Sequence, residues 1–173
     1  MSVSAPTVFK ITVLALLLIT LTAGAVGNQY PNLTSEGTRI VFRYGVGAKN
    51  ILDTYTGTFT KDMIVDPPVT IKMVLTEEDL LRIETKLEEL DFLSQSDWDL
   101  LPHGSTSGDR TPFSTYYLKV SFKGVTRELQ WNDSNLLSDD FKGPAVEVVK
   151  LLWSIIEAKP EYKSLPQPRG GYA

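Results

Sequence analysis

The sequence predicts an α+β fold in which an antiparallel sheet of about five strands carries two helices on one face, in the order β-β-β-α-β-β-α. Short segments alternate between apolar and polar residues, which is typical of half-buried strands. Two longer segments repeat apolar residues at spacings of three and four, as amphipathic helices do. With 173 residues, of which 42% are hydrophobic and 22% charged, the chain is long enough for one globular domain.

Three strands are predicted in residues 38–75. Residues 38–44 alternate and form the first. Residues 51–63 are rich in threonine and aromatic side chains, which favours extended structure with a bend at Gly57. Residues 66–68 (Asp-Pro-Pro) break this segment, because proline cannot donate to a strand ladder. Residues 70–75 alternate again and predict the third strand.

A capping box predicts where the first helix begins. The Thr76 hydroxyl can accept a hydrogen bond from the backbone N–H of Asp79, and the Asp79 carboxylate can bond back to Thr76. We expect the helix to end near Phe92, with one apolar face made of Leu80, Ile83, Leu87 and Leu90.

A hairpin and a second helix follow. If Lys123-Gly124 forms a two-residue turn, the expected apolar-side pairs are Phe122–Val125, Val120–Arg127, Leu118–Leu129 and Tyr116–Trp131. Arg127 is the one misfit in this register, which pairs Lys119 with Glu128 on the opposite side. Pro144 then occupies the first position of a helix that is apolar on all but a narrow stripe. Such a helix must be nearly surrounded by protein.

The N-terminus has the order of a secretory signal peptide. An apolar run, Ile11 to Leu21, follows Lys10 and precedes the small residues Ala23-Gly24-Ala25. The run is short for a membrane span, so we favour cleavage after Ala25 over an uncleaved anchor. In either case we expect the body to be extracytoplasmic, secreted or anchored, with membrane contact only through residues 8–26 if the segment is uncleaved.

These observations predict four parts of the chain. Residues 1–25 are a signal peptide or an N-terminal membrane anchor, and residues 26–37 form a polar spacer. Residues 38–158 form a single α+β domain. Residues 159–173 are rich in proline and glycine and predict an extended tail.

The composition excludes several classes of function. Lys and Arg number 17 against 21 Asp and Glu, a net charge of −4, so nucleic acid is not an expected partner. The chain has no cysteine and only one histidine, His103, which excludes disulfides, cysteine-rich zinc sites and sites with several histidines. We therefore expect no cofactor and assign no metal site or catalytic residue.

Four stretches resemble an uncharacterised family of exported bacterial proteins, many of them lipoproteins. They are Tyr44-Gly45, the run NILDTYTGTFTKDM at residues 50–63, residues 67–92 and the ending KPEYKSLPQPRGGY. The ending, a KPEYxxLPxPxGGY-type tail, is the most specific of them. The resemblance implies a location in the cell envelope and no activity. Residues 22–25 of this chain lack the lipid-accepting cysteine of the lipoprotein members.

The best candidate for a ligand-binding site lies between residues 53 and 62. This stretch mixes hydrogen-bond donors, acceptors and ring faces that could bind a sugar or a peptide, and its candidate residues are Asp53, Thr54, Tyr55, Thr58, Lys61 and Asp62. Alternating threonine is equally typical of an exposed strand. The polar loop at residues 94–114 is a second place where a ligand could bind.

Three functions remain open at this point. The favoured one is a noncatalytic binding or interaction module of the cell envelope whose partner is an unidentified envelope protein or ligand. The first alternative is an extracellular hydrolase that uses carboxylates or His103. The second is a calcium-binding structural protein with ligands among Asp97, Asp99, Asp109, Asp133, Asp139 and Asp140.

Overall fold

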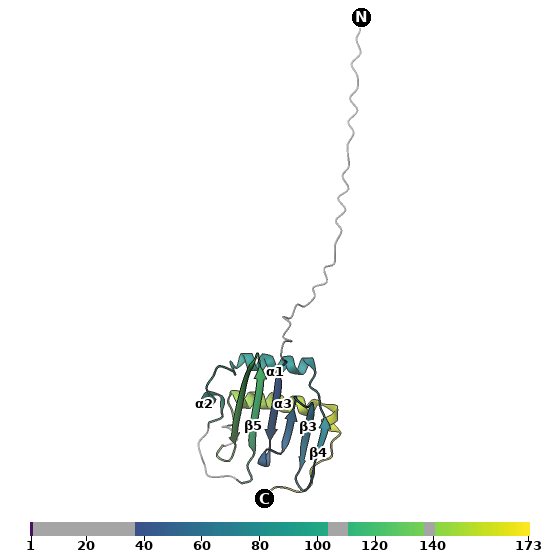
Figure 1. Cartoon of the computed structure of the whole chain (residues 1–173), viewed down its shortest axis with the longest axis vertical. Helices are drawn as coiled ribbons and strands as arrows, with labels where there is room; N and C mark the ends of the chain where they lie inside the picture. The colour runs from purple at the N-terminus through teal and green to yellow at the C-terminus, as the bar shows by residue number, and fades with distance from the viewer. Residues whose placement is uncertain (2–36, 104–110, 137–140) are drawn as a thin grey trace. The chain divides into compact units, whose positions relative to one another are not determined.

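The computed structural model describes Met1 and residues 37–103, 111–136 and 141–173. Over these residues the chain forms one antiparallel sheet with helices packed against one of its faces, so the predicted α+β class is confirmed (Figure 1). The sheet has six strands in the order β4-β3-β2-β1-β5-β6, rather than about five. The strands are β1 (Arg39–Tyr44), β2 (Asn50–Asp53), β3 (Thr58–Met63), β4 (Asp66–Lys72), β5 (Thr115–Phe122) and β6 (Val125–Asn132).

The extra strand arises because residues 51–63 form a hairpin, not one bent strand. The Asp53 carboxylate accepts a hydrogen bond from the backbone N–H of Tyr55 at 2.8 Å, and Gly57 adopts φ +67°, which glycine tolerates without strain. The chain therefore reverses between β2 and β3.

The expected break at residues 66–68 is also wrong. Pro67 and Pro68 lie inside β4, whose pairing with β3 shifts register between Lys61 and Met63. Because β4 is at the edge of the sheet and the prolines lie at this irregularity, their missing N–H groups cost few ladder bonds.

The β5–β6 hairpin has the predicted register, including the pairs Tyr116–Trp131 and Phe122–Val125. Arg127 pairs with Val120 and faces the helix side of the sheet, as the predicted register requires. Its guanidinium donates to the backbone carbonyl of Gln95 and lies 3.2 Å from the Asp97 carboxylate. The Arg127 charge is thus tolerated on the apolar side because it is bonded to the segment that follows the first helix.

Two long helices cover the sheet. α1 (Glu77–Glu89) begins after Thr76 with both capping-box hydrogen bonds present. α3 (Pro144–Ala158) begins with Pro144 in its first turn, as predicted. Two short helices, α2 (Asp97–Leu100) and α4 (Pro160–Lys163), and a 3-10 turn, η1 (Val46–Ala48), complete the elements of the described residues.

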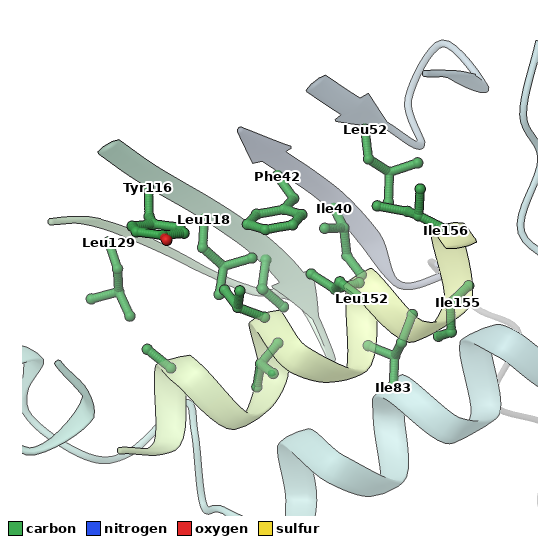
Figure 2. Close-up of a cluster of buried hydrophobic side chains, with 14 of the residues drawn as sticks. Ile40, Phe42, Leu52, Ile83, Tyr116, Leu118, Leu129, Leu152, Ile155 and Ile156 are labelled. Carbon is green, nitrogen blue, oxygen red and sulfur yellow. The ribbon is translucent and has the colours of Figure 1, made fainter. Parts of the chain in front are cut away.

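The core lies between the sheet and α3, with α1 beside α3 (Figure 2). Ile40 and Phe42 of β1 face Leu152 of α3, and all three are 0% exposed. Seven residues of α3 are buried, which confirms that this helix is nearly surrounded: Ala145, Val146, Val148, Val149, Leu152, Ile155 and Ile156.

The C-terminal residues are not extended throughout, because they begin with α4 and only then run along the β3–β4 side of the sheet. Polar contacts fix this segment, which we call the tail clasp. Lys61 Nζ donates to the Pro166 carbonyl at 3.0 Å, and Arg169 forms a two-bond ion pair with Asp66. The Tyr172 hydroxyl donates to Asp62 and accepts from Lys49 Nζ at 3.1 Å. Leu165 is buried beneath it.

None of the helices in the described ranges has the length and apolar character needed to cross a membrane. The apolar run at residues 11–21 lies outside those ranges.

Candidate ligand-binding face

The two faces of the sheet differ sharply. One packs on α1 and α3, whereas the other is covered by no other element of the described residues (Figure 1). Cross-strand pairing fixes which side chains occupy this second face, which we call the outer face. One row across the six strands is Lys72, Thr58, Asp53, Val41, Lys119 and Glu128, and the next row is Thr70, Thr60, Ile51, Arg43, Tyr117 and Gln130. A partial row of Arg39, Ser121 and Thr126 lies on the far side of the first.

At one end of the outer face, Tyr55 reaches from the β2–β3 turn across β1. Its hydroxyl lies 2.9 Å from Ser121 Oγ on β5, and the Arg39 guanidinium lies 5.2 Å from the centre of its ring. A cation at this distance is attracted by the negative face of the ring. A shallow depression of about 320 Å³ opens here, lined by Gly37, Arg39, Tyr55, Ser121, Phe122, Gly124 and Thr126.

At the other end, Arg43 lies 5.8 Å from the centre of the Tyr117 ring. The Tyr117 hydroxyl donates to Glu128 at 3.0 Å, and Lys119 Nζ lies 2.8 Å from the same carboxylate. A second depression, of about 500 Å³, is lined by Val41, Arg43, Ala48, Asp53, Thr115, Tyr117, Lys119 and Gln130. The two depressions share strands β1 and β5, so they lie along one line of the sheet.

The ionisable groups around Glu128 stabilise one another. The bonds from Lys119 and Tyr117 hold the pKa of the Glu128 carboxyl below its usual value. The bond to Glu128 raises the pKa of Lys119, and partial burial together with Glu128 raises the pKa of Tyr117. Near neutral pH the carboxylate is therefore ionised and the other two groups keep their protons.

Arg39 and Arg43 differ from this cluster because neither has a carboxylate within ion-pair distance among the described residues. Both are exposed. Each guanidinium carries five N–H donors in a fixed plane and suits a carboxylate or phosphate group. These two side chains thus hold hydrogen-bonding capacity that the described part of the protein does not use for ion pairs.

The structure brings only part of the predicted site together. Asp53, Tyr55 and Thr58 lie at the outer face. The Thr54 hydroxyl instead bonds to the backbone of Ile40, accepting from its N–H at 2.7 Å, and so extends the contact between β1 and the turn.

Lys61 and Asp62 belong to the tail clasp. Lys61 is 6% exposed, and its ammonium lies 5.0 Å from the centre of the Tyr162 ring. Asp62 accepts from the Tyr172 hydroxyl and from the backbone N–H of Ile64. The six predicted residues are therefore divided between the outer face, the β1 backbone and the C-terminal segment.

Sequence reasoning did not single out Arg39, Arg43, Tyr117 and Lys119 as candidate site residues. A signal was present, because the alternation of residues 38–44 places both arginines on the polar side of one strand. The sequence alone did not show which strand pairs with residues 38–44. Only the pairing of β1 with β5 places Tyr117 beside Arg43.

The residues of the two alternative functions lie elsewhere. The His103 ring stacks on Trp98 with 3.9 Å between ring centres, and its Nε2 contacts the Trp98 carbonyl. Asp97 faces Arg127, and Asp99 accepts from Ser96 Oγ at 2.6 Å.

Asp133 accepts a hydrogen bond from the backbone N–H of Ser114 at 2.8 Å. Asp109, Asp139 and Asp140 lie outside the described residues. Among the residues that are described, no three side chains of the metal-ligating types gather around a common point.

Comparison with known proteins assigns no family: no family model matches the chain, and no curated protein matches it.

Proposed function

We propose that this protein is a noncatalytic binding module of the cell envelope that takes its ligand on the outer face of the sheet. The observation that carries the proposal is the pair Arg39 and Arg43, exposed above two shallow depressions on the uncovered face, with no carboxylate partner in the described chain. Exposed groups with unused donors on a rigid sheet are pre-organised for binding.

A location outside the cytoplasm is part of the proposal. The apolar run before Ala25 and the resemblance to exported envelope proteins support it. The protein is then secreted or held at the membrane by its N-terminal segment. Cell fractionation with N-terminal sequencing tests this: we expect the exported form to begin at Val26. A protein found in the cytoplasm would contradict the location.

The chemistry of the outer face favours binding over catalysis. The carboxylates of its rows are held in place: Glu128 by Lys119 and Tyr117, and Asp53 by the backbone N–H of Tyr55. A general acid needs a carboxyl pKa raised toward neutral pH, and the pKa of Glu128 is lowered. These groups fix the shape and charge of a surface.

Amide-shift mapping of the isotopically labelled full chain with a soluble extract of the producing cell's envelope tests the binding surface. We expect shifts at the strands that carry the outer face, β1 and β5, and weaker shifts in Arg43→Gln. The matched control is Arg82→Gln, which removes an exposed arginine from α1. Shifts confined to α1, or an activity of the chain that His103→Ala abolishes, would contradict the proposal.

A further inference from the structure

We infer that the ligand of the outer face is an extended acidic glycan, a chain of sugars that bears carboxylates, lying along strands β1 and β5. This inference rests on the proposed function and adds the chemical class of the ligand.

The charge of the outer face is opposite in sign to that of the chain. Within the three rows described above, its cations are Arg39, Arg43, Lys72 and Lys119, and its carboxylates are Asp53 and Glu128. Asp62 follows Thr60 on the same side of β3, where it is bonded to Tyr172. The whole chain has a net charge of −4. Because Lys119 pairs with Glu128 and Lys72 lies on the edge strand β4, the attraction for an anion near β1 and β5 comes mainly from the two arginines of β1.

The distance between these two arginines favours an extended ligand. Arg39 and Arg43 are four residues apart on one strand, which at about 3.3 Å per residue separates them by about 13 Å. A single phosphate or carboxylate cannot bridge this distance. A polymer with repeated acidic groups can contact both guanidinium groups and lie in both depressions, which flank the same line of the sheet.

The hydroxyl groups of the outer face fit a sugar. Ser121 Oγ lies 2.7 Å from Thr126 Oγ1, and Thr60 Oγ1 lies 2.8 Å from Thr70 Oγ1. The Tyr55 hydroxyl also lies 2.9 Å from Ser121 Oγ, so Tyr55, Ser121 and Thr126 share two hydrogen bonds and one of their three O–H groups remains as a donor, with free lone pairs. The Thr60–Thr70 pair shares one hydrogen bond and likewise keeps one O–H group. Sugar hydroxyls also donate and accept, and can therefore bond to such pairs.

An acidic peptide fits this surface less well. Extended peptides bind sheets mainly by adding a strand at an edge, where backbone groups are unpaired. β1 lies between β2 and β5 and has ladder partners on both sides. Near Arg39 and Arg43, a ligand can therefore form hydrogen bonds with side chains but not with unpaired backbone groups. A glycan can bind through side chains alone.

The test is a titration of the full chain with an oligogalacturonate long enough to span about 13 Å, followed by amide shifts and calorimetry. The matched control ligand is the same oligomer with its carboxylates methyl-esterified. We expect the acid form to bind on β1 and β5, more weakly as salt is raised. We expect Arg39→Gln and Arg43→Gln each to weaken binding by about tenfold. Arg82→Gln should leave the dissociation constant unchanged.

The outcomes separate this inference from the proposed function. Equal binding of the methyl ester, or shifts on the outer face caused by polyglutamate and not by the oligogalacturonate, would overturn the acidic glycan and leave the binding surface in place. If the envelope extract shifts the amide signals of β1 and β5 while the oligogalacturonate does not, the acidic glycan is likewise overturned and the binding surface remains. If neither perturbs these strands, both the inference and the proposed function are wrong.

Discussion

Replacing Asp79 with asparagine removes one charge from the start of α1 and keeps the shape of the side chain. In the structure its carboxylate accepts hydrogen bonds from the backbone N–H of Thr76 at 2.9 Å and from the Thr76 hydroxyl at 2.8 Å. It also forms an ion pair with Lys159, and the two side chains are only 13% and 12% exposed. One carboxylate thus joins the start of α1 to the residue between α3 and α4.

The expected loss of stability in Asp79→Asn is about 2–3 kcal/mol. A hydrogen bond to a charged group contributes about 1.5–3 kcal/mol, and an acidic residue in the first turn of a helix adds about 0.5 kcal/mol through the helix dipole. Urea unfolding followed by circular dichroism measures this as a lower midpoint with an unchanged slope. Glu77→Gln, in the same turn but exposed, is the control and should change stability by less than about 0.5 kcal/mol.

The difference between wild type and Asp79→Asn should depend on pH. Partial burial disfavours the charged form, but hydrogen bonds from Lys159 and Thr76 outweigh it and hold the pKa of Asp79 below its usual value. A carboxyl whose pKa is lower in the folded state stabilises fully above the unfolded pKa of about 3.9, and this contribution is lost as the pH falls through the folded pKa. The gap should therefore be full at about pH 7 and shrink below about pH 4. Equal midpoints for Asp79→Asn and Glu77→Gln, or a gap that stays constant at acid pH, would refute the reasoning.

Two further predictions concern packing and the tail clasp. Leu152→Ala removes three buried carbons, worth about 2.4 kcal/mol by transfer, and leaves a cavity, so we expect a loss of about 2–5 kcal/mol in urea unfolding. Glu147→Ala on the exposed side of the same helix should cost less than about 1 kcal/mol, and equal losses would exclude a buried α3. Arg169→Gln breaks the ion pair with Asp66, so hydrogen exchange should accelerate in residues 165–172. Unchanged exchange there would mean that the pair does not hold the segment.

The elements predicted from the sequence depend on contacts between residues close together in the chain. The capping box joins Thr76 to Asp79, and the β5–β6 register follows from a turn of two residues. The last helix could be predicted from its own apolar pattern. In each case the decisive residues lie within one segment, so a single sequence contains the whole signal.

The features that could not be predicted depend on residues far apart. Lys61 is buried because the C-terminal segment supplies the Pro166 carbonyl, 105 residues later, and the Tyr162 ring. The candidate site needed the order of the sheet, because Arg43 meets Tyr117 only when β1 pairs with β5. Alternation shows that a side chain faces outward, but not which strand lies next to it.

The tail clasp has a consequence for when the domain can finish folding. Lys61 and Asp62 of β3 find their partners in Pro166 and Tyr172, which are 105 and 110 residues further along the chain. These partners leave the ribosome well after β3 does, whereas domains can begin to fold during synthesis. The β3–β4 side of the sheet therefore acquires these contacts only after residue 172 has left the ribosome, and a nascent chain stalled before residue 165 lacks them.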